Sequence, residues 1–397
     1  MSNLLKRINV LLVMVLLLCA TVPVSASTAG SSKTASMVAA GDGYALALNS
    51  EGRVFAWGEN DLGQLGDGTL KDHTTYVSTK LPSGTTSIFI AAGGGQSFAI
   101  DSNGSLWGWG CNYYGEVGDG TTANKKEPVH IGFPGDVSIA SVAADTDRSM
   151  ALDSTGVVWL WGRECYWKGA DSSGKMMDSQ SPRKVDFPEG VSISSIAIGF
   201  HQYLALDTEG HVWQWSPLVS PYTPAQVRFP ENTVIKAIDA GVDHCLAIDS
   251  ADKTWAWGAD LLGQLGNGQV WDDSDYSVPI LVSLKSTIHA FMVQAADKQS
   301  FVLDGDGNIW AFGNYWLWGD STYGDDGDIL AAQGTPTMMT KLKDIIYISM
   351  FTDNSYAICN DGTVWAWGSN NWRGGLGDGT TKERTVPEKV KGLKLSQ

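Results

Sequence analysis

Short apolar runs and turn residues alternate along this chain in a fixed order. Each unit begins with an apolar run that ends in small residues, as in Phe89–Gly93, and continues with a second run, as in Ser97–Asp101. A turn and a third run with paired aromatic residues follow. The runs are four to six residues long and most are bounded by Gly, Asn or Asp. Because such runs are too short for helices, the pattern predicts β-strands.

The third run carries an aromatic pair that recurs seven times, followed by Gly in all but one copy. These corner motifs lie at residues 55–58, 107–110, 159–162, 213–216, 255–258, 310–313 and 365–368. They start 42 to 55 residues apart, a period typical of solenoids, propellers and arrays. Both faces of this strand are apolar, which requires sheets packed on either side of it. The sequence therefore predicts an all-β, seven-bladed β-propeller over residues 37–397.

The turn before the corner has a consistent chemistry. In five copies Asp or Asn comes first and Gly fourth, as in Asn49–Gly52, which predicts a type I turn closed by a left-handed residue. Asp252 replaces the Gly in the fifth copy, and Asp tolerates that conformation. Segments after the corners, such as Pro128–Ile131 and Val386–Val390, predict a fourth strand. The sequence leaves open whether Val386–Val390 completes the last blade or pairs with the first.

These motifs together resemble the regulator-of-chromosome-condensation repeat. The resemblance rests on the small-small-Gly run, the Ala-Leu-Asp strand, the corner, and the Gly-Gln-Leu-Gly-Asp-Gly-Thr turn at residues 63–69. It spans roughly residues 37–392 and implies a seven-bladed propeller. The fourth copy departs from the pattern, because Ser216 replaces the corner Gly and the Leu-Gly-Asp-Gly turn is missing. We therefore expect a remodelled outer part in that blade.

A second departure concerns the position three residues after the Gly of the first strand, where the family often has His. Only His244 matches. The other copies with a clear register have Tyr44, Gln96, Arg148, Gln202 and Asn354 there.

Residues 1–26 are typical of a secretory signal peptide. Lys6 and Arg7 precede an apolar run, and Val24 and Ala26 place small residues where a signal peptidase reads. A polar leader over residues 27–36 follows, rich in Ser and Thr. We therefore expect a protein that is secreted or associated with the cell envelope after cleavage near Ala26.

The net charge of the chain limits the classes of partner that it can bind. The formal net charge of −16 becomes −18 when the predicted signal peptide, with Lys6 and Arg7, is removed. An acidic surface repels nucleic acid. Relatives implied by the resemblance bind chromatin and a small GTPase. The acidic charge and the expected export predict that this protein binds neither of them.

Catalytic and metal chemistry are not evident in the sequence. The six His residues are scattered, and no nucleophile elbow or phosphate-binding loop is present. Asp304–Asn308 begins like a calcium loop, but Ile309 stands where the required Gly would be. We expect no enzyme activity, no cofactor and no metal; an enzyme with its site in the central channel is a third hypothesis.

Four cysteines lie outside the predicted signal peptide. Cys245 and Cys359 fall in inner strands of blades that are not neighbours, which favours free buried thiols. Cys111 and Cys165 both follow corners in adjacent copies, so a disulfide between them and two free thiols are both open.

Five tryptophans lie outside the corners, in segments where the family pattern would place polar or small residues. Equivalent segments leave the blades on the same side, so these rings and the nearby aspartates form a candidate binding rim. Trp is common at binding hot spots, although local packing over the blade edges is the alternative. The candidate residues are Trp167, Trp271, Asp272, Asp273, Asp275, Trp316, Trp318, Asp320, Asp325, Asp326, Asp328 and Trp372.

Two function classes follow from this rim. The first is a secreted, non-enzymatic scaffold that engages a partner protein through loops on one rim, as the resemblance to secreted bacterial members of the family implies. The second is a propeller that binds carbohydrate or cell-wall polysaccharide, with exposed tryptophans stacked on sugar rings. The sequence identifies neither ligand.

Overall fold

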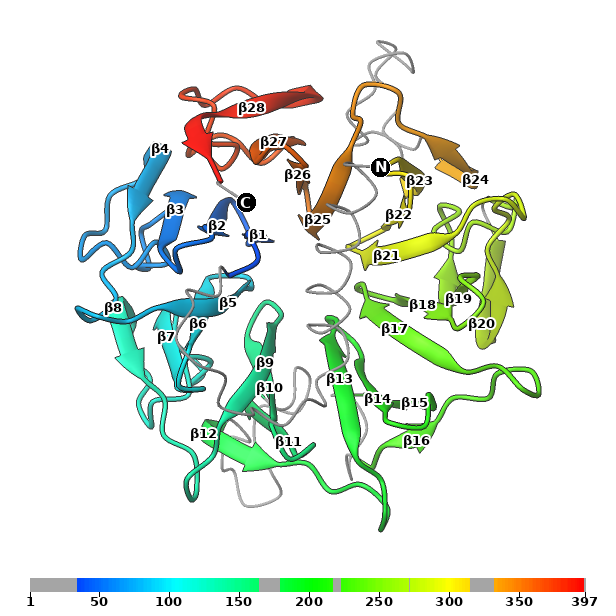
Figure 1. Cartoon of the computed structure of the whole chain (residues 1–397), viewed down its shortest axis with the longest axis horizontal. Helices are drawn as coiled ribbons and strands as arrows, with labels where there is room; N and C mark the ends of the chain where they lie inside the picture. Colours follow the sequence, from blue (N-terminus) through cyan, green and yellow to red (C-terminus); the bar gives the residue numbers. More distant parts are fainter. Residues whose placement is uncertain (1–33, 164–178, 217–222, 271, 315–331, 396–397) are drawn as a thin grey trace, which may run out of the picture.

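The computed structural model describes residues 34–163, 179–216, 223–270, 272–314 and 332–395. They form seven four-stranded sheets arranged as blades around a common centre (Figure 1). Within each blade the strands are antiparallel and neighbours in sequence are neighbours in the sheet. The predicted all-β, seven-bladed propeller is confirmed. No helix among the described residues is long and apolar enough to cross a membrane.

Each blade is built from four consecutive strands, of which the first lies innermost (Figure 1). The first four blades comprise β1 (Met37–Ala40), β2 (Tyr44–Leu48), β3 (Val54–Gly58) and β4 (His73–Ser78); β5 (Ser87–Ala92), β6 (Gln96–Asp101), β7 (Leu106–Gly110) and β8 (Lys125–His130); β9 (Ile139–Ala144), β10 (Arg148–Asp153), β11 (Val158–Gly162) and β12 (Ser179–Lys184); and β13 (Ile193–Ile198), β14 (Tyr203–Asp207), β15 (Val212–Trp215) and β16 (Ala225–Gln226). The last three comprise β17 (Ile235–Ala240), β18 (His244–Asp249), β19 (Thr254–Asp260) and β20 (Asp272–Leu281); β21 (Ala290–Ala295), β22 (Gln299–Asp304), β23 (Ile309–Asn314) and β24 (Ala332–Met338); and β25 (Ile345–Phe351), β26 (Asn354–Cys359), β27 (Thr363–Gly368) and β28 (Arg384–Lys394). The fourth blade has the shortest outer strand, the two-residue β16, which confirms its expected remodelling.

The hairpin turns have the predicted backbone. Gly52 has φ of 76° and Asp252 has φ of 63°, so both are left-handed. The first Asp of the turn also fixes the first corner tryptophan, because Trp107 Nε1 donates to Asp101 Oδ2 at 3.1 Å. The turn and the corner therefore stabilise each other within a blade.

The second corner aromatic joins each blade to the one before it. Trp109 is fully buried, and its Nε1 donates to the carbonyl oxygen of Gln64 at 2.9 Å. Trp161 makes the same bond to the carbonyl oxygen of Glu116 at 2.8 Å. In these two blades the indole thus holds the glycine-rich loop of the preceding blade. Trp215 and Trp367 pack at the same position without a hydrogen bond from Nε1, and the sixth blade has Phe312 there.

The position where the family often has His also bridges blades. Tyr44 donates to the carbonyl oxygen of Gln96 at 2.6 Å, and Gln96 Nε2 donates to the carbonyl oxygen of Asp145 at 2.6 Å. His244 Nε2 lies 2.8 Å from Ser300 Oγ, and Ser300 itself donates to another carbonyl, so His244 is the donor. Different side chains at this position therefore make the same kind of contact, which explains why the family His is not required.

The ring closes without exchange of strands. β28 pairs with β27, so the segment Val386–Val390 completes the last blade. The first and last blades meet through a shared apolar cluster that includes Val38, Trp57 and Tyr356. Trp57 Nε1 and Tyr356 Oη both donate to the carbonyl oxygen of Gly375, at 2.9 and 2.6 Å.

Candidate functional site

One face of the propeller gathers two sets of loops. Strand direction alternates within a blade, so the turn between the first and second strands and the loop between the third and fourth leave on the same face. We call it the loop face. Its described outer loops are residues 59–72, 111–124, 261–270 and 369–383, and its described turns lie at the mouth of a central channel, where several of their residues line a cavity.

The outer loops share a rigid internal framework. Asn112 Oδ1 accepts the N–H of Val117 at 2.9 Å, and its Nδ2 donates to Asp119 Oδ1 at 3.0 Å. Asp260 and Asn371 accept the equivalent N–H groups in the fifth and seventh blades. The framework holds the next residue of each loop at the same place on the ring.

That next residue is apolar and exposed in three blades. Tyr113 and Trp372 are each 60% exposed and Leu261 is 43% exposed. In the first blade the equivalent residue is Asp61, which is also exposed. Because the same loop position carries an exposed apolar side chain in three blades, we take these residues as candidates for contact with a partner. The sequence analysis selected only Trp372 of this set.

Trp372 lies over a charged cluster at the junction of the last and first blades. The guanidinium carbon of Arg373 is 4.3 Å from the centroid of the Trp372 ring. Arg373 Nη1 lies 2.9 Å from Asp61 Oδ2 and 3.3 Å from Glu59 Oε1. Burial, with repulsion from Asp61, raises the pKa of Glu59 to about 7. Asp61 and Glu59 thus position the guanidinium of Arg373, and this cation packs against one face of the Trp372 indole.

The channel mouth is acidic. The turns between first and second strands contribute Asp42, Asp147, Asp243, Asp297 and Asp353 from five blades. Burial raises the pKa of Asp42, Asp297 and Asp353, and for Asp353 the other two carboxylates raise it further. A cationic group at this mouth would relieve the mutual repulsion of these carboxylates.

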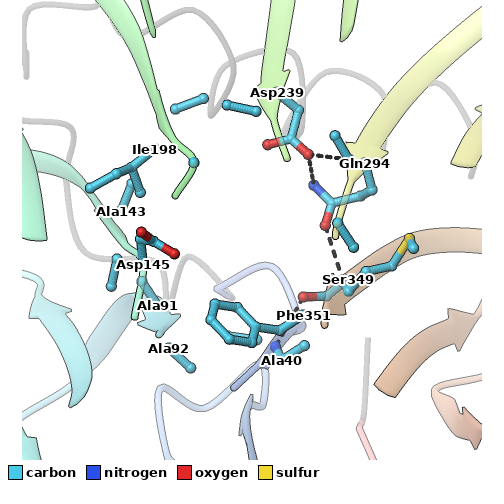
Figure 2. A pocket seen from close by; sticks show the side chains of 18 of the residues that line it. Ala40, Ala91, Ala92, Ala143, Asp145, Ile198, Asp239, Gln294, Ser349 and Phe351 are labelled. Atoms are coloured by element: carbon cyan, nitrogen blue, oxygen red, sulfur yellow. Dashed lines mark hydrogen bonds between the residues drawn. The ribbon is translucent and has the colours of Figure 1, made fainter. Parts of the chain in front are cut away.

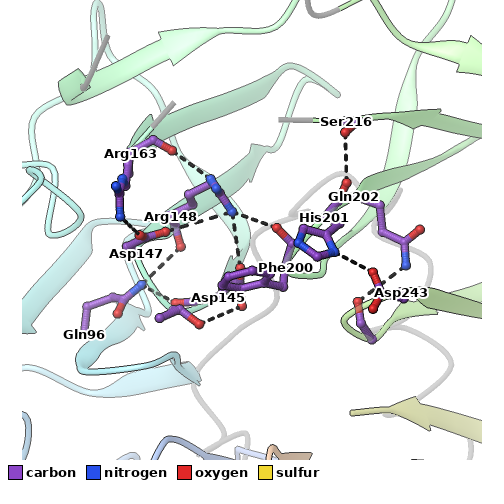
Figure 3. A network of polar contacts seen from close by, with 12 residues as sticks. Gln96, Asp145, Asp147, Arg148, Arg163, Phe200, His201, Gln202, Ser216 and Asp243 are labelled. Carbon is purple, nitrogen blue, oxygen red and sulfur yellow. Dashed lines mark hydrogen bonds and ion pairs between the residues drawn. The ribbon is translucent and has the colours of Figure 1, made fainter. Parts of the chain in front are cut away.

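Arg148 has a structural role beside the mouth. It is 1% exposed; its Nε donates to the carbonyl oxygen of Arg163 at 2.7 Å and its Nη1 donates to that of Phe200 at 2.9 Å (Figure 3). Its guanidinium also pairs with Asp145 and Asp147. This network joins the third and fourth blades and leaves Arg148 committed to the protein itself.

Most residues of the predicted rim lie outside the part of the chain that the structure describes. Asp272, Asp273 and Asp275, which the sequence analysis assigned to a loop, belong to strand β20, whose backbone pairs Asp272 with Asp260 of β19. The following predicted residues lie outside the described residues: Trp167, Trp271, Trp316, Trp318, Asp320, Asp325, Asp326 and Asp328. The predicted signal peptide, residues 1–26, lies outside them too. Trp372 is the predicted site residue whose surroundings the structure describes.

No disulfide joins any two of the cysteines in the described residues, Cys111, Cys245 and Cys359. Cys111 Sγ donates to Glu116 Oε1 at 2.9 Å, and burial beside that carboxylate raises the pKa of the thiol. Cys165 lies outside the described residues, so a pairing with Cys111 stays a prediction. Cys245 is buried as expected, whereas Cys359 is only partly buried. The described residues also contain no group of three or more His, Cys, Asp or Glu arranged to hold a metal ion.

Sequence profiles identify the repeats. The profile of the regulator of chromosome condensation (RCC1) repeat matches residues 103–152 and 361–396. A second profile of the same repeat matches residues 38–64 and 88–116. These segments are similar to RCC1 repeats. They include the outer loops that carry Tyr113 and Trp372.

Curated relatives match this chain over part of their length. Ultraviolet-B receptor UVR8 of Arabidopsis thaliana is 29% identical over 178 residues, which cover 45% of this chain and 40% of that protein. E3 ubiquitin-protein ligase HERC2 of Homo sapiens is 30% identical over 180 residues, which cover 44% of this chain and 4% of that protein. The chain thus spans less than half of the length of either relative.

Solved RCC1 propellers have the same fold. Prp20p from Saccharomyces cerevisiae superimposes with a TM-score of 0.76 at 23% identity, covering 87% of both chains. The yeast RCC1 protein Prp20 bound to Kap60 gives a TM-score of 0.75 at 21% identity, covering 94% of this chain and 90% of that one. This likeness confirms the architecture.

Proposed function

We propose that this protein is a non-enzymatic binding propeller that engages a partner protein through the loop face. The observation that carries the proposal is Trp372, 60% exposed and held by Arg373 above Asp61 and Glu59. Exposed aromatic rings on a rigid support bury much area at little entropic cost, so they suit a binding hot spot. Tyr113 and Leu261 extend the surface across the same face.

The charge of the face defines the partner further. The acidic channel mouth and the net charge of −16 favour a partner with a basic patch beside an apolar one. Binding of Prp20p to Gsp1p and histones is a property of that protein. For this chain, the exclusion of nucleic acid and of a small GTPase stays a prediction from charge. We further propose that the protein acts outside the cell or at its envelope, because residues 1–26 have the pattern of a secretory signal peptide.

Affinity capture with alanine variants tests this proposal. The purified protein and the variants Trp372→Ala and Tyr113→Ala are used as bait for secreted and envelope fractions, and the captured material is identified by mass spectrometry and carbohydrate analysis. We expect a protein partner whose recovery falls by roughly tenfold or more for Trp372→Ala, as for a hot-spot residue. Val234→Ala is the matched control, because Val234 is 45% exposed in a connection between blades, away from the loop face.

Two results would contradict the proposal. If Trp372→Ala, Tyr113→Ala and Leu261→Ala recover the partner as well as the control does, the loop face is not its binding surface. If only polysaccharide is captured and Trp372→Ala loses it, the carbohydrate-binding hypothesis replaces the proposal. Circular dichroism of each variant verifies that the propeller is intact.

A further inference from the structure

The central channel contains a cavity of about 490 Å³, within the range of small-ligand sites. First strands from all seven blades and the turns of the channel mouth supply its lining. The described lining residues include three aspartates, Asp145, Asp239 and Asp297, and no lysine, arginine or histidine. The cavity is therefore open to a cation and offers no basic group to an anion.

Asp239 is the one charged residue in a layer of small and neutral ones. The strand register identifies the equivalent residue in each of the other blades. Each one lies on the first strand and pairs with the residue two positions after the one at the family's His position. The layer consists of Ala39, Ala91, Ala143, Ala197, Asp239, Gln294 and Ser349. Four alanines leave open space in front of the carboxyl group.

Bridging between blades does not account for this charge. Asp239 Oδ2 accepts the N–H of Ala295 at 2.6 Å and Gln294 Nε2 at 3.3 Å (Figure 2). Gln294 Oε1 accepts the N–H of Met350 at 3.2 Å, and Ser349 Oγ accepts that of Ala40 at 3.0 Å. Neutral side chains thus make the same bridge in the next two blades, so a carboxylate is not needed for it.

The second oxygen of Asp239 is turned towards the cavity (Figure 2). Burial raises the pKa of Asp239 to about 7, because a lone carboxylate is poorly solvated there. A cation at this oxygen would offset a negative charge that is poorly solvated. Oδ2 already accepts two N–H groups, and the backbone N–H of Ala240 also interacts with the carboxylate. The oxygen that faces the cavity therefore suits the single-point contact of an ammonium group better than the two-point contact of a guanidinium.

The rest of the lining suits an alkyl stem. The phenyl ring of Phe351 is directed into the cavity near Ala40 (Figure 2), and alanines line the opposite wall. A stem of several methylene groups would be covered by these surfaces while its ammonium head reaches Asp239. We propose that the channel is a binding site for a primary alkylammonium group, with Asp239 as its counter-ion. The group would come from a lysine side chain of a partner protein or from a free amine.

Calorimetric titration with n-pentylamine tests the site, with n-pentanol as its neutral counterpart. We expect the protein to bind the amine and not the alcohol, and Asp239→Asn to weaken amine binding by roughly tenfold or more. Asparagine keeps an oxygen for the N–H of Ala295, so this variant should fold with an unchanged circular dichroism spectrum. Asp186→Asn is the charge-matched control, because Asp186 is exposed in the connection between β12 and β13 and lies outside the cavity lining; this variant should bind the amine with unchanged affinity.

The dependence on pH gives a second readout. Affinity should rise as pH increases from about 6 to about 8, because the carboxyl group of Asp239 loses its proton, and Asp239→Asn should lack this rise. Cys245 and Tyr347, which also lie near Asp239, stay neutral in this range because burial raises the pKa of both. Two other acidic groups line the cavity, and burial raises the pKa of Asp145 to about 6 and also raises that of Asp297. Any change of affinity with pH that remains in Asp239→Asn is their contribution, and the difference from the control is the contribution of Asp239.

A lysine-containing peptide and the same peptide with Nε-acetyllysine distinguish the two sources. Binding of only the unmodified peptide assigns the site to a partner's lysine, whereas binding of the amine but neither peptide assigns it to a free amine. The inference is overturned if the protein binds no amine up to about 10 mM, binds pentanol equally well, or retains its affinity in Asp239→Asn. None of these results depends on the loop-face surface, so the two proposals fail separately.

Discussion

Replacing Trp57 by Phe measures how tightly the ring is closed. Trp57 is fully buried between the last and first blades and donates to the carbonyl oxygen of Gly375 at 2.9 Å. Tyr356 donates to the same oxygen, so the variant leaves that acceptor with a partner. Trp109→Phe is a matched change between the first and second blades. Its acceptor, the carbonyl oxygen of Gln64, likewise has a second donor, Ser97, at 2.8 Å.

The expected cost follows from the two contributions that Phe lacks. Loss of one buried hydrogen bond costs about 1 kcal/mol, and the space left by the smaller ring costs roughly 1–2 kcal/mol. Both variants should therefore lower the free energy of unfolding by about 2–3 kcal/mol. Equilibrium unfolding in urea, followed by both tryptophan fluorescence and circular dichroism, measures this difference and verifies that the transition is cooperative.

Unequal costs would refute the reasoning. If Trp57→Phe costs less than about 0.5 kcal/mol while Trp109→Phe costs the expected amount, the first and last blades do not pack in solution as the structure shows. A closed ring with equivalent junctions requires the two values to agree within roughly 1 kcal/mol.

Three further predictions concern buried polar groups. The folded-state pKa of Glu59 is about 7 against an ordinary 4.5, so stability should fall as pH rises from about 4.5 to about 7, and Glu59→Gln should remove this fall in urea midpoints. Burial lowers the pKa of His244 to about 4 from 6.5, so stability should fall as pH drops from about 6.5 to about 4, and His244→Gln should flatten that limb. Arg148→Met leaves the buried Asp145 without its cation, whereas Asp147 keeps Arg163 at 3.2 Å. The variant should destabilise the fold by about 3–5 kcal/mol in thermal unfolding, and a loss below about 1 kcal/mol would contradict the network described for Arg148.

The sequence predicted the fold because each blade repeats local signals. The hairpin turns could be placed from Asp, Asn and Gly spacing, and even Asp252 was assigned correctly to a left-handed turn. The corner tryptophans predicted strands covered on both faces. How the ring closes could not be predicted, because Val386–Val390 has a pattern compatible with the edge of either terminal blade.

The candidate site was predictable only in part. Trp372 was a candidate because it stands outside the corner pattern, but the sequence left its exposure open. Tyr113 and Leu261 needed the structure, because side-chain exposure within a loop depends on how the loop folds back. Asp239 had a visible signal in hindsight, since it stands in the small-small-Gly run where four other copies have Ala and none has a charged residue. Which face of that strand lines the channel depends on the curvature of the whole ring, and a single repeat does not encode it.

Closure without strand exchange has a consequence for biosynthesis. Every blade consists of four consecutive strands, so each sheet can form as soon as its own stretch of about fifty residues has left the ribosome. No early strand needs to wait, with an unpaired edge, for a partner translated hundreds of residues later. The last event is then the docking of two finished blades through Trp57, Tyr356 and their apolar neighbours, a step that side-chain packing and a few hydrogen bonds between the blades control.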